Sequence, residues 1–353
     1  MTESGKTSNR WTVGEPTTPV AMRVFANLYV AVFGRKAFYG WNRRLLNLAV
    51  RGMGIGNPSV EMVEAGEDRL IRSLRPLGAV HIFDIGAHVG EFAVRIQAGC
   101  PEARIWSFEP HPKSYRQLAT TVAGTGVTAV NLALSDVPGQ AMLYDYDDGT
   151  AEDGSVHASL HQEVFAEIHH GHASGFEVQM TTVDAFMAAH DIERIAMLKV
   201  DAEGHELAIL RGARQAIERK AVDIVQFEFN EMNVMSRVFF RDFYDALPDF
   251  TFYRMASNGL APLGPYQPRT HELFILQNIV AIRDVFDHLS TLVWPGPGVS
   301  DRPRSRLRTC APSHRPLRER PATVQPRLGT PISTLEGGRY HAAVPRGQRR
   351  FHL

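Results

Sequence analysis

The sequence predicts an α/β fold, with a doubly wound, mostly parallel seven-stranded sheet of Rossmann-like type and an N-terminal helical extension. The first observation is that short apolar runs alternate with helical segments between residues 80 and 229, which is the pattern of a parallel sheet with helices on both faces. The second is a glycine loop that directly follows the first apolar run. The third is that polar residues stand where strands are expected to end, the edge at which open α/β sheets bind ligands.

The expected elements follow one another in chain order. Strands of the parallel core are predicted at Val80–Ile85, Arg104–Phe108, Thr128–Leu132, Ile195–Val200 and Asp223–Phe229. Helices are predicted near residues 91–98, 112–122, 183–190, 204–218 and 239–247. An antiparallel pair, Thr251–Tyr253 and Leu273–Leu276, is expected to complete the sheet. Residues 137–180 interrupt the alternation, and we interpret them as a flap on the substrate side.

The glycine loop is the first candidate binding element. Glycine lets a backbone turn tightly and approach a ligand closely, and the helix that follows directs its unpaired N–H groups at whatever lies over the loop. The loop is neither the Gly-x-Gly-x-x-Gly dinucleotide fingerprint nor a P-loop, and its spacing better fits a loop that holds S-adenosylmethionine. The candidate cofactor-binding residues in this loop are Asp84, Gly86, Ala87, His88 and Gly90.

The second strand ends in an acid, Glu109, about 20 residues past the loop. A doubly wound nucleotide-binding sheet places a carboxylate there to accept hydrogen bonds from ribose hydroxyls. The alternative is a solvated residue at a strand end. The sequence therefore predicts a ribose contact at Glu109.

Five segments in order resemble the FkbM-type family of class I S-adenosylmethionine-dependent methyltransferases. They are the loop Asp84–Gly90, Phe108-Glu109-Pro110, Asn131 to Asp136, Leu198-Lys199-Val200-Asp201-Ala202-Glu203-Gly204-His205 and Gln226-Phe227-Glu228. The resemblance implies S-adenosyl-L-methionine as cofactor, with Ser135 and Asp136 near its adenine, although these two residues could equally form a simple turn. His88 departs from the asparagine that the family often carries.

The densest polar cluster ends the fourth strand and carries the predicted chemistry. Methylating an alcohol requires removal of its proton, and Asp201 is the first candidate for base or substrate orienter. His205 is the rival base, or else a helix-capping or surface residue. Lys199 is expected to pair with a neighbouring carboxylate, which offsets the cost of its burial. Glu203 is a catalytic candidate that could instead cap the next helix.

Other polar residues have weaker assignments. Glu228 is expected to bind a substrate hydroxyl or to anchor its loop, and Ser159 in the flap to contact substrate. Asp201, Glu203 and Glu228 end neighbouring strands, so a divalent cation is an alternative. Lys199 already supplies positive charge, however, and no metal is predicted. Five flap histidines lack metal-ligand spacing and are expected to be solvated: His157, His161, His169, His170 and His172.

Composition bounds the remaining regions of the 353-residue chain. Only two cysteines are present and no apolar run reaches the length of a membrane span or forms a signal peptide, so we expect a cytoplasmic protein. Residues 296–353 hold 12 Arg and 3 acids, which predicts a disordered tail, with anion binding as the alternative. The expected divisions are 1–15 disordered, 16–76 helical extension, 77–295 methyltransferase domain and 296–353 tail.

The extension contains two expected amphipathic helices, Pro19–Tyr39 and Trp41–Arg51. Residues 16–60 hold six basic residues and no acid. We expect these helices to pack beside the sheet and wall the substrate site. Contact with an anionic membrane surface is the alternative.

The sequence thus predicts an O-methyltransferase that uses S-adenosyl-L-methionine and acts on a hydroxyl of a sugar, glycan or polyketide-like natural product. The expected partner is a small-molecule or glycan acceptor, without nucleic acid. N-methylation, a nicotinamide-dependent oxidoreductase and a non-catalytic S-adenosylmethionine-binding module are the alternatives. Joint presence of the loop, Glu109 and the 199–205 cluster argues against the last of these.

Overall fold

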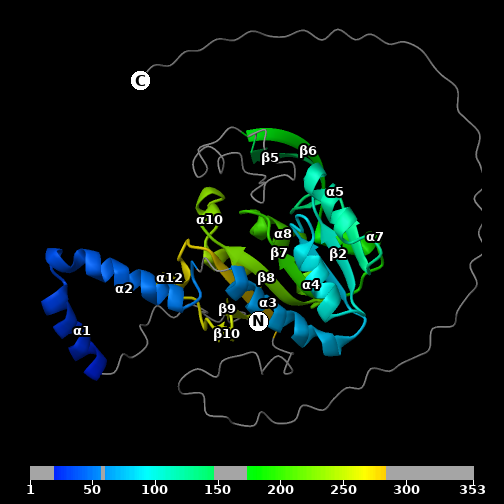
Figure 1. The fold of residues 1–353 in the computed structure, drawn as a ribbon. Helices are drawn as coiled ribbons and strands as arrows, with labels where there is room; N and C mark the ends of the chain where they lie inside the picture. The colour runs from blue at the N-terminus through cyan, green and yellow to red at the C-terminus, as the bar shows by residue number, and fades with distance from the viewer. Residues whose placement is uncertain (1–19, 57–59, 147–172, 284–353) are drawn as a thin grey trace, which may run out of the picture. The chain divides into compact units, whose positions relative to one another are not determined.

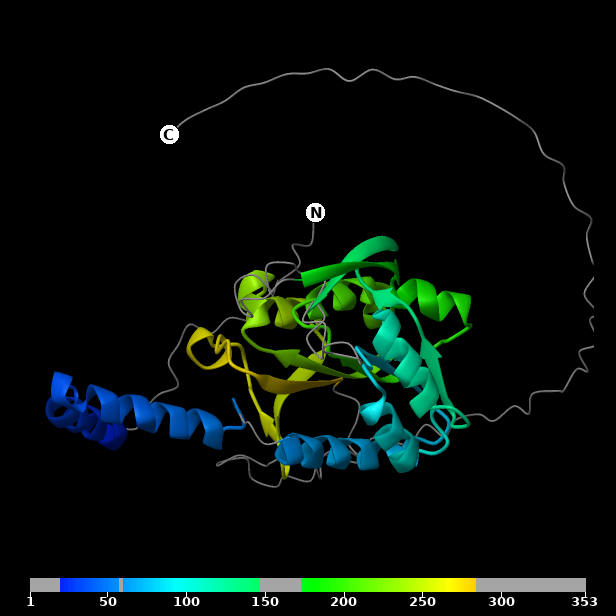
Figure 2. The same ribbon diagram turned by 45° about the horizontal axis from the view of Figure 1, so that its top comes forward.

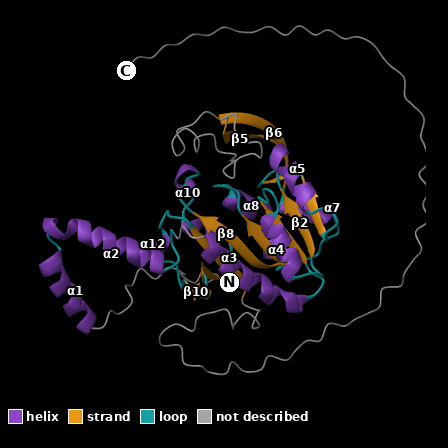
Figure 3. Cartoon of the chain, viewed as in Figure 1, coloured by secondary structure: helices purple, strands orange, loops and turns teal. Residues whose placement is uncertain are grey.

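The computed structural model describes residues 20–56, 60–146 and 173–283. Its centre is an eight-stranded sheet of order β10-β9-β11-β8-β7-β1-β2-β3, shown with its covering helices in Figures 1 and 3. The five parallel strands are β1 (His81–Ile85), β2 (Arg104–Phe108), β3 (Val127–Val130), β7 (Ile195–Val200) and β8 (Val222–Phe229). The antiparallel strands are β9 (Phe250–Ala256), β10 (Gly259–Pro262) and β11 (Gln277–Arg283).

The predicted doubly wound, mostly parallel sheet is confirmed, with β10 as an additional strand at one edge. One expected strand, Leu273–Leu276, is wrong. These residues follow the short helix α12 (Pro268–His271) and form turns, in which Leu273 N donates to His271 O and Ile275 N donates to Leu273 O. The chain extends only after the turns, and the strand that pairs with β8 is therefore β11.

Helices cover both faces of the sheet, as Figure 2 shows. One core contains residues of α3 (Val60–Leu74), α4 (Glu91–Gly99) and α5 (Pro112–Thr121), packed against strand residues such as Ile82. The other contains residues of α7 (Val183–Ala189), α8 (Glu206–Gly212), α9 (Arg214–Glu218) and α11 (Phe240–Ala246), packed against strand residues such as Phe83. Ile82 and Phe83 therefore belong to opposite faces, as the alternation of a strand requires.

The helix predicted across residues 204–218 is divided into α8 and α9. A Cβ on Gly212 would lie 2.0 Å from the carbonyl oxygen of Ser135, so only glycine allows the end of α8 to approach that chain so closely. The carboxylate of Asp184 then accepts hydrogen bonds from the amides of Gln215 and Ala216 at the start of α9. These contacts explain why two short helices replace one long helix.

The predicted insert contributes two strands to a second, three-stranded sheet of order β4-β6-β5, whose strand β4 lies just before it in the chain. Its strands are β4 (Ala133–Leu134), β5 (Gly139–Tyr146) and β6 (Ala173–Thr181). His111 Nε2 lies 3.3 Å from Asp145 Oδ2, which joins β5 to the start of α5. Ser159 and the five flap histidines lie outside the described residues, so their expected roles stay predictions.

The N-terminal helices are α1 (Val20–Phe33) and α2 (Tyr39–Gly52), joined through the 3₁₀ turn η1 (Lys36–Phe38). No side chain of α1 is buried, and on α2 only Val50 is. The expectation that these helices pack beside the sheet is therefore wrong for α1, whereas the end of α2 does reach the sheet, where Arg51 and Gly52 line a cavity with Met255. The helix α3, which the sequence reasoning missed, occupies that place with Leu70, Ile71 and Leu74 buried in the core. The expected division points at residues 15, 76 and 295 stay predictions.

The remaining short helices connect these elements. They are the 3₁₀ helix η2 (Arg75–Leu77) before β1 and the four-residue helix α10 (Met232–Met235) after β8. Among the described residues, no helix is long and apolar enough to cross a membrane.

Candidate cofactor and acceptor site

The glycine loop joins β1 to α4 at the carboxyl edge of the sheet. The amides of Gly86 and Ala87 both donate to the carbonyl oxygen of Phe108 at the end of β2. Gly86 has a φ of +76°, and a Cβ there would lie 1.7 Å from the carbonyl oxygen of Asp201. The glycine at position 86 is therefore required by the close passage of the loop against the end of β7, as well as by any ligand above it.

Two further loop residues have left-handed backbone conformations. Gly90 has a φ of +93°, and a Cβ there would lie 2.8 Å from Leu118 on α5. His88 has a φ of +47°, in the region that asparagine and histidine adopt more readily than most residues. This backbone conformation explains how histidine can replace the family's asparagine without changing the course of the loop.

Glu109 connects the loop to the turn that follows β2. Its Oε2 accepts the backbone N–H of His88 and its Oε1 that of His111, both at 2.8 Å. Burial raises the pKa of Glu109 to about 7, against the opposing effect of these two backbone hydrogen bonds. The sequence predicted a ligand contact here but not this structural role. Each carboxylate oxygen has a second lone pair, so both roles are compatible.

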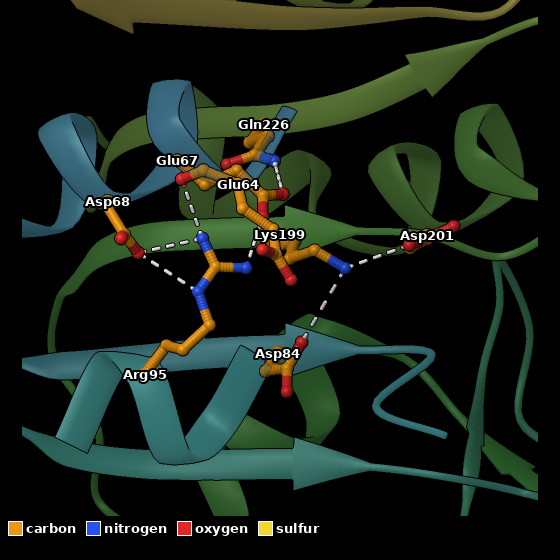
Figure 4. Close-up of polar contacts among 8 residues, drawn as sticks. All are labelled: Glu64, Glu67, Asp68, Asp84, Arg95, Lys199, Asp201 and Gln226. Carbon is orange, nitrogen blue, oxygen red and sulfur yellow. Dashed lines mark hydrogen bonds and ion pairs between the residues drawn. The ribbon is translucent and has the colours of Figure 1, made fainter. Parts of the chain in front are cut away.

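The ammonium group of Lys199 lies between two carboxylates at the end of β7, as Figure 4 shows. Its Nζ is 2.9 Å from Asp201 Oδ2 and 3.9 Å from Asp84 Oδ1, and it lies 4.8 Å from the centre of the Phe92 ring. Burial lowers the pKa of Lys199, but the carboxylates of Asp201 and Asp84 outweigh it, so the pKa is raised. The predicted pairing of Lys199 is present.

Asp84 is completely buried beneath this cluster. Burial raises the pKa of its carboxyl group to about 6, although the positive charge of Lys199 and a hydrogen bond from Ser107 Oγ at 3.3 Å both lower it. The first residue of the loop is therefore an acid whose ionisation is opposed by burial and favoured by the positive charge of Lys199.

Near the cluster, a second polar network joins α3 to α4 and β8 (Figure 4). Glu67 accepts from Arg95 Nη1 and from Gln226 Nε2, each at 2.9 Å. Arg95 also donates to Asp68 and to the backbone oxygen of Glu64. Sequence reasoning missed Glu67, although the three-to-four-residue spacing of Glu64, Glu67 and Asp68, which places them on one helix face, was a readable signal.

Glu206, another residue that the sequence reasoning missed, braces the turn after β7. Its Oε1 accepts the amides of Ala202 and Gly204 at 3.1 Å each. The turn at Gly204, which Glu203 was considered to brace, is thus braced by Glu206, while Glu203 itself has a left-handed φ of +48°. Burial raises the pKa of Glu206 to about 7, and the backbone hydrogen bonds that it accepts lower it.

His205 is brought to the end of β4 by the start of α8. Its Nε2 lies 2.9 Å from Ser135 Oγ, which also donates to Asp136 Oδ1 at 3.1 Å. The three residues form a chain of polar contacts although 70 positions separate Ser135 from His205. His205 makes no side-chain capping hydrogen bond, so this contact, rather than the considered capping role, accounts for its orientation.

Glu228 is half-buried near the end of β8. Burial, and then the negative charges of Asp201 and Glu203, raise its pKa well above the ordinary value, although Lys199 lowers it. Asn278 is the residue paired with Glu228 across β8 and β11, and it lines a cavity of about 210 Å³. Paired residues of antiparallel strands share one face, so the side chains of Glu228 and Asn278 lie on the same face of the sheet.

The residues present fit an S-adenosylmethionine site in their chemistry. A nine-residue helix begins directly after the glycine loop, a buried carboxylate stands at the end of β2, and a buried carboxyl group opens the loop. Asp84 Oδ1 has no hydrogen-bond partner among the described residues. Within the same residues, no group of three His, Cys, Asp or Glu side chains is arranged to hold a metal ion.

The strand order, the loop after β1 and the acid after β2 together define the fold of class I S-adenosylmethionine-dependent methyltransferases. Residues 84–254 match the family model described as methyltransferase FkbM domain. This match at residues 84–254 confirms the resemblance read from the sequence.

Individual relatives are more distant. The chain is 28% identical over 155 residues to the methyltransferase sdnD of Sordaria araneosa, in an alignment that covers 37% of this chain and 59% of that protein. Similar solved structures include an O-methyltransferase from Bacillus cereus, at 12% identity and a TM-score of 0.32, covering 74% of this chain and 97% of that one. Another is precorrin-6y C5,15-methyltransferase from Geobacter metallireducens, at 10% identity and a TM-score of 0.33, covering 61% and 87%.

Proposed function

We propose that this protein transfers the methyl group of S-adenosyl-L-methionine to a hydroxyl oxygen of a small-molecule or glycan acceptor, such as a sugar or a polyketide-like compound. The observation that carries the proposal is the pair of carboxylates beside the glycine loop, Asp84 and Asp201, which lie 3.9 Å and 2.9 Å from Lys199 Nζ. When bound, the cofactor supplies an electrophilic methyl group on sulfonium. The protein must then align the acceptor oxygen and accept its proton.

The cofactor-binding residues proposed are those at the ends of β1 and β2 and near β4. The start of α4, directly after the 86–90 loop, offers backbone N–H groups, and Glu109 offers acceptors for ribose hydroxyls. Asp84 supplies negative charge for the cationic methionine portion. Ser135 and Asp136 are proposed to lie near the adenine.

In this proposal Asp201 orients the acceptor hydroxyl, and Glu228 is a candidate for the base that accepts its proton. The ammonium group of Lys199 lies 2.9 Å from Asp201 Oδ2 and fixes the position of that side chain, which suits a group that orients a hydroxyl. Glu228 has a raised pKa and therefore a greater affinity for a proton. Its partner across β8 and β11, Asn278, lines the cavity. We therefore add Glu228 to Asp201 as a candidate for the base, and His205 is the third candidate.

The test is to supply the purified protein with methyl-labelled S-adenosylmethionine and a panel of sugar, glycan and phenolic or macrolide acceptors. Transfer of label to an oxygen is expected. Asp201→Asn and Glu228→Gln keep the shape of each side chain and are expected to lower turnover by about 10²–10⁴-fold if the residue is the base. The residue that orients the hydroxyl should show the smaller loss of turnover.

Asp249→Asn and Glu218→Gln are matched controls at exposed carboxylates, 57% and 65% exposed, and should retain full turnover. Transfer of label to nitrogen would replace the proposal by N-methylation. Cofactor binding without transfer to any acceptor would support a non-catalytic binding module, and absence of cofactor binding would refute the site.

A further inference from the structure

The helices α1 and α2 form a hairpin (residues 20–52) with its own internal contacts (Figure 1). Tyr29 donates to Asn42 Oδ1 at 2.6 Å, and Asn42 Nδ2 donates to the backbone oxygen of Phe33 at 2.9 Å. The Phe33 ring packs edge-on against Phe38 at 5.1 Å between centroids. These contacts fix the two helices together, so the apolar side chains that remain exposed belong to a formed surface.

The exposed apolar residues of this hairpin are large and numerous. On α1, Phe25 and Leu28 are each 63% exposed, and on α2 Trp41 is 54% and Leu48 is 66% exposed. Many large apolar side chains exposed on one short segment of a soluble protein mark an interaction site. No residue of α1 is buried against the rest of the described chain. The surface therefore requires a partner outside the chain segments described.

The charges of the hairpin indicate what that partner is. Residues 20–56 contain six basic residues and no acidic residue. On α2, Trp41, Leu45 and Leu48 fall on one helix face, Arg44 and Arg51 flank that face along one edge, and Arg43 lies further round the helix. A helix with cations on one face and Trp or Leu on the other is the arrangement that lies in a membrane interface.

We propose that the α1–α2 hairpin binds the surface of an anionic lipid bilayer. Anionic headgroups attract the arginines, while the apolar faces enter the boundary of the acyl chains. The helix α1 has 14 residues and is shorter than the roughly 20 that a spanning helix requires, so the hairpin lies on the bilayer. The hairpin of a second copy is disfavoured as the partner because it would bring another six cations and no anion.

The test uses the full chain with vesicles of phosphatidylcholine alone or with about one third phosphatidylglycerol, a fraction at which polybasic amphipathic surfaces bind measurably. Co-sedimentation with the anionic vesicles is expected. Leu45→Ser combined with Leu48→Ser should reduce the partition constant at least about tenfold, since two apolar side chains lose their burial. Arg43→Glu combined with Arg44→Glu should reduce it by a similar factor and remove most of its dependence on anionic lipid.

Controls separate the hairpin from other surfaces. Val94→Ser combined with Met142→Ser makes the same kind of change at residues 41% and 42% exposed elsewhere and should bind vesicles as the unmodified chain does. Trp41 fluorescence, taken as the difference from Trp41→Phe, should shift to the blue and be quenched by brominated acyl chains. Equal vesicle binding by the Leu45/Leu48 variant, or a Trp41 signal unchanged by vesicles, would overturn the proposal. A dimer that forms without any binding to vesicles, and that is lost in the Leu45/Leu48 variant, would also overturn the proposal.

Discussion

Asp84→Asn should stabilise the folded protein at pH 8, although it changes a residue of the proposed cofactor site. The pKa of Asp84 is raised from 3.8 to about 6, chiefly by burial. Because a tenfold change in proton affinity corresponds to about 1.4 kcal/mol, ionising Asp84 in the folded state costs about 3 kcal/mol relative to the unfolded chain. An asparagine of the same shape removes that cost. It should also weaken S-adenosylmethionine binding, since the negative charge for the methionine portion is lost.

The sign of the pH dependence follows from linkage. Between about pH 4 and 6 the folded state holds the Asp84 proton that the unfolded chain has lost, so this group makes stability fall as pH rises. The difference between Asp84→Asn and the unmodified protein should therefore be near zero at pH 4 and reach its full size above pH 6. Urea unfolding followed by circular dichroism at pH 4.5 and pH 8 (roughly the two ends of this window) measures it.

Asp223→Asn is the matched control because Asp223 is also buried, at 2% exposed, but pairs with Arg194 at 2.7 Å and with the buried Arg283. Removing that charge leaves a buried guanidinium without its ion-pair partner, which costs about 3–5 kcal/mol. The same substitution should therefore stabilise at position 84 and destabilise at position 223. Destabilisation of Asp84→Asn that is equal at both pH values would refute the burial argument.

Two further predictions concern the loop and its acid. Gly86→Ala should abolish folding or cofactor binding because its Cβ would lie 1.7 Å from the Asp201 carbonyl oxygen. Thermal unfolding and calorimetry measure the two effects. The control is Gly124→Ala, at a similar φ of +74° but with nothing within 4 Å, which should reduce stability only by the small cost of backbone strain. Since the pKa of Glu109 is raised to about 7, affinity for S-adenosylhomocysteine should fall from pH 8 to pH 6 as the carboxylate gains a proton. Glu109→Gln should bind weakly at both pH values by calorimetry, and an unchanged affinity would contradict the ribose contact.

The parallel core could be predicted from sequence because its signals are local. Apart from the divided 204–218 helix, every core strand and helix predicted between residues 80 and 247 begins and ends within two residues of the observed element. Buried parallel strands are continuous apolar runs, and the glycine and proline residues at their ends are explicit stops. The same signals placed Lys199 and Asp201 at one strand end, where they pair.

The remaining features depend on contacts between distant segments. The division of the 204–218 helix arises from Ser135 and Asp184, which lie far from it in sequence. The Ser135–His205 contact joins residues 70 positions apart. The exposure of α1 and α2 reflects a sheet face already covered by α3, and no periodicity within those two helices indicates which helix takes that place.

Because of the network around Glu67, the segment that folds together is longer than the segment that matches the family model. The family match begins at residue 84, yet α3 supplies Leu70, Ile71 and Leu74 to the core and Glu67 to Gln226 and Arg95. Recombination that exchanged only the matched segment would cut through β1 and leave Arg95 and Gln226 without that carboxylate. Exchange between relatives can succeed only if the breakpoint precedes α3, so this helix and the catalytic sheet should be inherited together.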